Sequence, residues 1–160
     1  MKNPIFLVLV YLFVSAGSAM AQQGWVVTPG DGVGAITVGM SPDAAKLVVT
    51  PTREVNSKGM PALVEYGTDL VIEYRNRKAS IISLHSNSIK TKNGSVSWTP
   101  YNGAAIGTPW NTVVGRIPGT KLSHKLPTAK GHPEEIYHAY QHLGIGFRIK
   151  GGSIVRVDIW

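Results

Sequence analysis

Two alternating rows of apolar residues near the end of the sequence constrain the fold more than any other feature. Apolar and polar residues alternate through residues 145–160, on either side of a Gly-Gly-Ser sequence at 151–153. This period of two is typical of strands, and a hairpin buries one face when both apolar rows lie on it. The pattern places Phe147 opposite Val157 and predicts a three-residue turn at 151–153, because a two-residue turn would put Phe147 opposite Arg156.

A second hairpin with the same pattern lies in the first half of the sequence. Leu70 and Ile72 alternate with polar or outward-facing positions, and Ile82 and Leu84 follow a turn at residues 76–78 with the same offsets. We therefore expect Ile72 opposite Ile82, again across a three-residue turn. The chain is predicted to build this hairpin twice.

Residues 1–21 have the features of a secretory signal peptide. Lys2 precedes an apolar run at residues 5–14, and small residues then lead to a cleavage pattern that ends at Ala21. The apolar run is too short to cross about 30 Å of hydrocarbon comfortably. We therefore expect cleavage after Ala21, a periplasmic location and no membrane span in the exported chain.

The composition of the expected exported chain limits the classes of partner that it could bind. There is no cysteine, which excludes disulfides and lipid attachment at a cysteine. Without Lys2, 15 of the 16 Lys and Arg residues remain, against 9 Asp and Glu. An intracellular protein with this excess would suggest nucleic acid, which we do not expect here. The charge instead indicates anionic envelope polymers, lipid head groups or an acidic protein partner, and a plain solvated surface is the alternative.

The order of the predicted elements indicates an α+β fold with two related halves, each a short helix packed on antiparallel strands that end in a hairpin. The first half covers residues 22–85 and contains a polar loop at 51–60. A connecting segment covers residues 86–102, and its Asn-Gly turn at 93–94 predicts a small hairpin. The second half covers residues 103–160.

Both predicted helices begin with a hydroxyl residue followed by proline. Ser41 would cap a helix over residues 42–48, and Thr108 would cap a helix from Pro109 to about Gly115. A side-chain oxygen at the cap accepts a backbone N–H, and proline suits the first helical position because its missing N–H is not needed there.

Three short segments resemble a known superfamily: residues 39–45 (GMSPDAA), 107–113 (GTPWNTV) and 140–149 (YQHLGIGFRI). They are similar to parts of the tandem α+β modules of the beta-lactamase inhibitory protein and outer-membrane assembly lipoprotein superfamily. The chain lacks the lipobox cysteine of the assembly lipoproteins and the disulfides usual in the secreted inhibitors. The resemblance implies a binding module whose sheet or loops engage another envelope protein.

The sequence therefore predicts a periplasmic binding protein without catalytic activity or cofactor, and within that class an inhibitor or immunity-type protein acting on an envelope enzyme. An envelope assembly or stress accessory factor is the alternative, followed by a small hydrolase or a ligand carrier. The candidate partner-binding residues belong to a long loop at 118–132, a basic hairpin tip and an aromatic region: Lys121, His124, Lys125, Lys130, Arg75, Arg77, Lys78, Trp98, Tyr101 and Trp110. The hairpin tip could also serve solubility, and the aromatic residues could also cover the core.

Residues that could support chemistry are few. The best metal candidates are His132, His138 and His142. The sequence favours a strand over residues 136–140, in which residues four apart lie about 13 Å from each other, so we expect no metal site. Glu134 and Glu135 follow a proline and predict a solvated turn rather than an acid–base pair. No G-x-S-x-G nucleophile motif is present in the sequence.

Overall fold

The computed structural model describes residues 24–160, and the expected signal peptide lies outside these residues. The described chain is mostly β, with 50% strand and 12% helix. The predicted α+β class is therefore wrong. Within residues 24–160 the two α-helices, α1 (Pro42–Val48) and α2 (Trp110–Val113), are short, whereas segments expected to be loops form additional strands.

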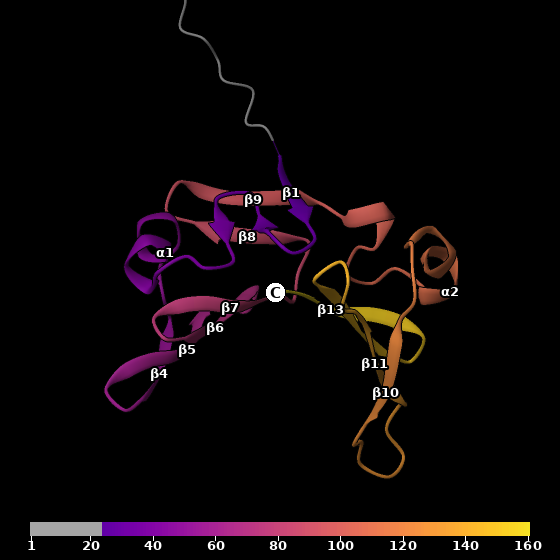
Figure 1. The fold of residues 1–160 in the computed structure, drawn as a ribbon. Coiled ribbons are helices and arrows are strands. Elements are labelled where there is room, and N and C mark those ends of the chain that lie inside the picture. The colour runs from indigo at the N-terminus through magenta and orange to yellow at the C-terminus, as the bar shows by residue number, and fades with distance from the viewer. Residues whose placement is uncertain (1–23) are drawn as a thin grey trace, which may run out of the picture.

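An antiparallel sheet of eight strands forms the larger layer. In spatial order its strands are β10 (Leu122–Leu126), β11 (Glu135–Tyr140), β12 (Ile145–Lys150), β13 (Ser153–Ile159), β7 (Lys78–Leu84), β6 (Leu70–Arg75), β5 (Met60–Tyr66) and β4 (Arg53–Ser57). β13 and β7 therefore meet at the centre, and β10 and β4 form the edges. In Figure 1 the two ends of this sheet bend downward as two arms, β4 with β5 on the left and β10 with β11 on the right.

A smaller sheet of five strands lies above the larger one. Its strands are β3 (Ile36–Thr37), β2 (Gly32–Val33), β1 (Trp25–Thr28), β9 (Gly94–Thr99) and β8 (Ser88–Thr91). The predicted hairpin of the connecting segment is confirmed, because Ile89 pairs with Val96 across β8 and β9. The smaller sheet and both α-helices lie on the same side of the large sheet (Figure 1). The core fills the space between the layers.

Both predicted hairpin registers are confirmed. Phe147 lies opposite Val157, and Ile72 lies opposite Ile82. The predicted three-residue turns are wrong, because each hairpin turns on two residues with positive φ, a Gly-Gly pair in one and an Asn-Arg pair in the other. Two-residue turns of this kind match the twist of antiparallel strands. A β-bulge near each turn then shifts the pairing by one residue and produces the predicted register.

Two of the segments expected to be polar loops contain the edge strands of the large sheet. β4 lies in the predicted loop at 51–60, and β10 lies in the predicted loop at 118–132. All residues of β4 and all but one residue of β10 are exposed. An edge strand with polar side chains has no buried row, so its sequence lacks the alternation that identifies a half-buried strand.

The predicted start of α1 is confirmed. The Ser41 hydroxyl accepts a hydrogen bond from the Ala44 N–H at 3.2 Å, and Pro42 occupies the first helical turn. α1 has seven residues and ends before an extended segment.

The predicted start of α2 is wrong. Thr108 does not cap the helix; Pro109 is the N-cap and makes no side-chain cap bond. The Trp110 N–H instead donates to the Gly152 carbonyl at 2.9 Å, which ties the helix start to the turn between β12 and β13. After four residues α2 passes into a 3₁₀ turn, η2 (Val114–Arg116). A second 3₁₀ turn, η1 (Tyr101–Gly103), precedes it in the chain. Among residues 24–160 no helix has the length and apolar composition needed to cross a membrane.

Candidate functional site

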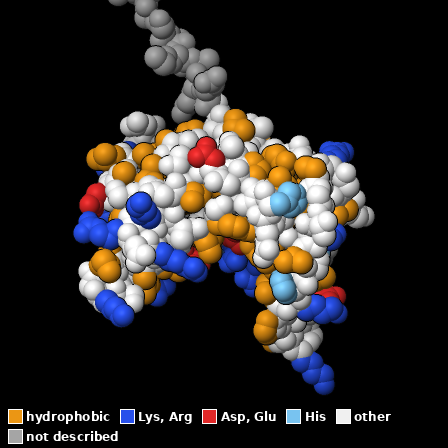
Figure 2. All heavy atoms as spheres, in the orientation of Figure 1, with side chains coloured by type: hydrophobic (Ala, Val, Ile, Leu, Met, Phe, Trp, Pro, Cys, Tyr) orange, Lys and Arg blue, Asp and Glu red, His pale blue; other side chains and the backbone are white. Residues whose placement is uncertain are grey.

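The large sheet has one covered face and one open face. Strand alternation directs Ile72, Ile82, Phe147 and Val157 into the core, where each is at most 1% exposed. The residues between them point to the opposite side, which no described helix or small-sheet strand covers (Figure 1). In Figure 2 this open face lines the hollow between the two arms, where hydrophobic, acidic and basic side chains are visible. We therefore take the open face as the candidate functional site.

Two aromatic side chains lie on the open face, on either side of Gly146. Tyr137 belongs to β11 and Trp160 follows β13, and both are half-buried. A side chain at Gly146 would collide with the Tyr137 hydroxyl and the Trp160 ring, so the glycine allows both rings to lie over β12. Burial, and then the charge of Asp158, raises the pKa of Tyr137. The phenol therefore stays protonated and can donate a hydrogen bond.

A buried carboxylate marks the centre of the open face. Asp158 is 2% exposed and accepts a hydrogen bond from the Ser83 hydroxyl at 2.6 Å. It also accepts two bonds from the Arg156 guanidinium, at 3.1 and 2.9 Å. Ser83 and Asp158 are directly opposite each other where β7 pairs with β13. A buried charge is costly unless it is paired. The bonds to Asp158 hold Arg156 in one orientation, and the bond from Ser83 links the two halves of the sheet.

A second ion-pair network lies beside Tyr137. Glu135 is 7% exposed. Its carboxylate accepts hydrogen bonds from the Arg148 guanidinium and forms an ion pair with the Lys150 ammonium at 3.0 Å. Arg148 first and Lys150 second hold the pKa of Glu135 below its ordinary value. The predicted solvated turn is wrong for Glu135, because β11 begins there and places its side chain between two cations on the neighbouring strand.

The two halves of the sheet differ in chemistry on the open face. The β12–β13 hairpin follows the β6–β7 hairpin at a constant offset of 75 residues, as the equal pairings of Ile72 with Ile82 and of Phe147 with Val157 show. Equivalent open-face positions are Val71 and Gly146, Glu73 and Arg148, Ile81 and Arg156, Ser83 and Asp158, and His85 and Trp160. The first half presents mainly aliphatic and small polar side chains, whereas the second presents arginines and aromatic rings.

The ten residues predicted for partner binding do not form one site. They fall into a basic group at the β6–β7 turn, a group on or beside β10, and the aromatic residues: Arg75, Arg77 and Lys78; Lys121, His124, Lys125 and Lys130; Trp98, Tyr101 and Trp110. Of the group at β10, His124 lies opposite Tyr137 and shares the open face. Lys125 forms an ion pair with Glu134 at 2.7 Å. At the other end of the sheet, Arg77 lies 3.4 Å from Asp43.

The three predicted aromatic residues contribute to the core side of the molecule. Trp98 is 5% exposed, and its indole N–H donates to the Ser86 carbonyl at 2.7 Å. Tyr101 and Trp110 are half-buried and pack against the core. Trp98 therefore covers the core, as the alternative interpretation predicts. Trp110 additionally lines a pocket described below.

The metal candidates are separated by the fold. The predicted strand over residues 136–140 is confirmed, so His138 lies within β11 and His142 lies in the turn that follows it. Within residues 24–160 no three His, Cys, Asp or Glu side chains are grouped so that they could hold a metal ion.

Sequence reasoning missed Tyr137, Arg148, Arg156 and Trp160 as site residues. The signal was present, because these residues occupy the positions between the apolar rows of β12 and β13 and the matching position of β11. Whether such a row meets water or a second layer depends on how the rest of the chain packs. The sequence of the hairpin alone therefore does not predict which of its faces is covered.

Comparison of the chain with protein-family models, curated proteins and solved structures gives no match. The resemblance to the tandem α+β modules therefore stays a prediction. Function has to be argued from the residues themselves.

Proposed function

We propose that this chain is a periplasmic binding protein whose open face holds a segment of another envelope protein, and that it acts as an inhibitor or immunity-type protein of an envelope enzyme. The observation that carries the proposal is the grouping of Tyr137, Arg148, Arg156 and Trp160 on a hollow sheet face without cover. Tyr, Trp and Arg are the residue types enriched among interface hot spots. An antiparallel sheet that simply faces water would present a plain polar row there.

The two arginines are held in place before any partner arrives. Glu135 fixes Arg148, and Asp158 fixes Arg156, through charge-assisted hydrogen bonds. A side chain that is already ordered loses less conformational entropy on binding, and this favours affinity. Such a surface suits a protein that blocks a partner without changing shape.

The charge of the arms favours an acidic partner. Lys58 lies at the β4–β5 turn and Lys130 lies in the loop between β10 and β11, and both are exposed. Figure 2 shows basic side chains at the lower end of each arm, on both sides of the hollow. An acidic segment that enters between the arms would be attracted from both sides, which raises the association rate at low salt.

The proposal is tested by affinity capture from envelope extract, followed by an activity assay of the captured enzyme. The open-face variants are Tyr137→Ala and Trp160→Ala. Their matched controls are Leu63→Ala and His85→Ala, which change the equivalent positions of the first half. We expect the open-face variants to weaken binding at least about tenfold, the effect of roughly 1.4 kcal/mol. The controls should stay within about threefold of the parent.

Inhibition distinguishes this function from its alternative. The captured enzyme should lose activity when the parent protein is added and keep it with Trp160→Ala. A partner that binds without any change in its activity would favour the assembly or accessory role instead. Equal binding by the open-face variants and their controls would remove the open face from the interface. Intact mass tests the proposed export, since the exported chain should begin at Gln22.

A further inference from the structure

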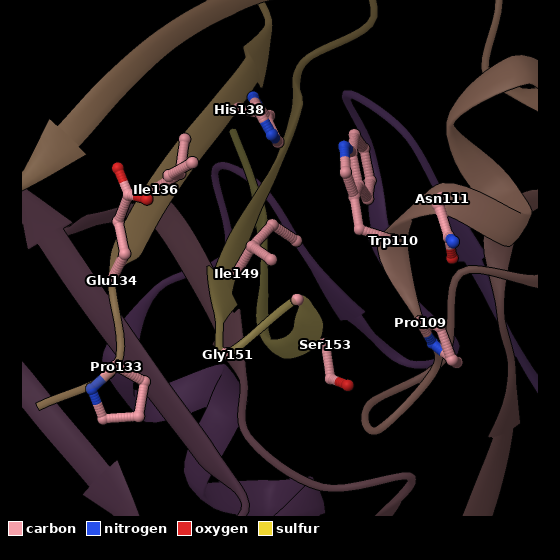
Figure 3. Close-up of a pocket in the computed structure, with 11 residues that line it drawn as sticks. Pro109, Trp110, Asn111, Pro133, Glu134, Ile136, His138, Ile149, Gly151 and Ser153 are labelled. Atoms are coloured by element: carbon pink, nitrogen blue, oxygen red, sulfur yellow. The ribbon is translucent and has the colours of Figure 1, made fainter.

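A pocket of about 720 Å³ opens on the covered-face side of the large sheet, in the second half. It lies between the start of α2 and the start of β11. Figure 3 shows Ile149 between these two walls, Pro133 and Glu134 on one side, and Trp110 with His138 together at one end. Sites for small molecules are typically clefts of roughly 300–1,000 Å³ with apolar walls and a few polar groups. The pocket meets this description and does not involve the open face.

At the equivalent place in the first half of the sheet the described residues enclose a smaller hollow. There Tyr74 stands where the second half has Ile149, and Tyr74 is 5% exposed with its hydroxyl 3.1 Å from that of Tyr66. The hollow that Tyr74 lines measures about 280 Å³. The smaller side chain of Ile149, together with the short α2, therefore leaves the space that the tyrosine fills in the first half.

The polar end of the pocket is firmly held. His138 is 7% exposed, and its ring stacks on the Trp110 ring with centroids 4.7 Å apart and planes 19° apart. Its Nδ1 lies 2.8 Å from the Ser123 hydroxyl. Burial, and then Lys121, lowers the pKa of His138, so the imidazole is neutral at neutral pH. A neutral imidazole with Nδ1 engaged still offers Nε2 to a ligand.

The charge near this end is positive. The Lys121 ammonium lies 5.5 Å from the centre of the Trp110 ring, and Lys121 makes no ion pair within residues 24–160. Glu134, the acid at the opposite wall, is compensated by Lys125 at 2.7 Å. Lys121 does not itself line the pocket, but its ammonium lies against the ring of Trp110, which does.

We propose that this pocket binds a carboxylate attached to an apolar body, with the apolar part against Ile149 and the carboxylate directed toward Lys121. The apolar walls supply most of the binding energy, because the burial of apolar surface is the dominant favourable term in association. The ammonium and the imidazole orient the acid group. Two sources share this chemistry, a fatty acid and the free C-terminus of a peptide that ends in an apolar residue.

The binding is tested by titration of the complete exported protein with octanoate and with acetyl-Gly-Leu, each compared with its own carboxamide. The isoleucine δ-methyl signals in NMR spectra report the site. We expect shifts at Ile136 and Ile149, no shifts at Ile72 or Ile82, and at least tenfold tighter binding of the acid than of the amide. The tighter of the two acids identifies the source.

Three variants sharpen the test. Lys121→Met should reduce the affinity for the acid to that for the amide. Lys92→Met changes an exposed lysine that forms no ion pair within residues 24–160 and does not line the pocket, so it should keep the preference for the acid. Ile149→Tyr gives the second half the residue of the first and should abolish binding of both acid and amide. The amide spectrum of each variant shows whether it is folded.

Equal binding of acid and amide by the parent protein would overturn the proposal, as would methyl shifts in the first half rather than at the pocket. A loss of acid preference in Lys92→Met as large as in Lys121→Met would also overturn it, because the charge would then act only through the general field. These outcomes do not bear on the open-face function, which uses other residues.

Discussion

The two ends of the large sheet share the same hairpin register, yet the pocket on the covered side is smaller in the first half, at about 280 Å³, than in the second, at about 720 Å³. In the first half a seven-residue α1 and the ring of Tyr74 fill the covered side. In the second half α2 has four residues and Ile149 replaces the tyrosine, so a pocket remains. On the opposite side the second half carries the rings and the arginines. The second half therefore holds the pocket and the aromatic and arginine residues on which the open-face proposal rests.

The largest effect is expected from an acid placed in the core of either half. Phe147→Asp and Ile72→Asp each bury an unpaired carboxylate at a position with 0% exposure, which costs several kcal/mol, roughly the whole stability of a small domain. Because both residues belong to one core cluster, either variant should unfold the entire chain. Far-UV circular dichroism and amide NMR spectra measure this. Native NMR signals that persist in the other half would show that the halves fold independently. A variant that melts like the parent would mean that the strand faces are inverted.

A smaller effect should distinguish the two halves on the open face. Gly146→Val places a branched side chain against Tyr137 and Trp160, and overpacking of this kind costs about 1–3 kcal/mol. The reverse change at the equivalent position, Val71→Gly, introduces a flexible residue into a half-buried strand and should cost about 1 kcal/mol. Urea unfolding measures both. A loss in Gly146→Val well below about 1 kcal/mol would mean that the two rings move aside freely.

The two helix starts should differ by a measurable amount. Ser41→Ala removes the only side-chain cap bond described for α1 and should cost about 1 kcal/mol. Thr108→Ala removes a hydroxyl that caps nothing, so its effect should stay within about 0.5 kcal/mol. A large loss of stability in Thr108→Ala in urea titrations would contradict the observed start of α2.

The smallest effect concerns pH. Arg148 and Lys150 lower the pKa of Glu135, so its ion pairs stabilise the fold fully above the ordinary pKa of 4.5. This contribution is lost as the pH falls through the lower pKa of the folded state, because the unfolded state then binds the proton more readily. Glu135→Gln should therefore flatten the acid branch of the stability profile. The change should be modest, since the Arg148 and Lys150 side chains are 35% and 43% exposed to water. Identical acid branches would remove Glu135 from the pH response.

The sequence correctly predicted the strand register of both hairpins, because the apolar pattern determines it. The pairings of Phe147 with Val157 and of Ile72 with Ile82 follow from the requirement that two apolar rows share a face, and both are present. The turns were wrong because a bulge and a two-residue turn produce the same register as a three-residue turn. The apolar pattern cannot distinguish these two solutions.

The fold class and the candidate sites depend on features that have no local pattern. β4 and β10 are polar edge strands, and their pairing partners are what makes them strands. Both strands were predicted as loops, and the strand content of the fold was therefore underestimated. The pocket depends on where α2 stops, which is set by the hydrogen bond between Trp110 and the β12–β13 turn. The local sequence of β4, β10 or α2 does not identify the distant residues with which it pairs or bonds.

The junction of β7 with β13 joins two strands that lie far apart in the sequence. The large sheet is joined at its centre by three residue pairs, between residues 82–84 and residues 157–159. In a chain that emerges with its N-terminus first, β7 can pair with β6, but its other edge at residues 82–84 stays unpaired until β13 arrives. Unpaired apolar edges aggregate, and pairings between distant residues form slowly. Until β13 pairs with it, this edge is open to proteases and to pairing with other copies of the chain.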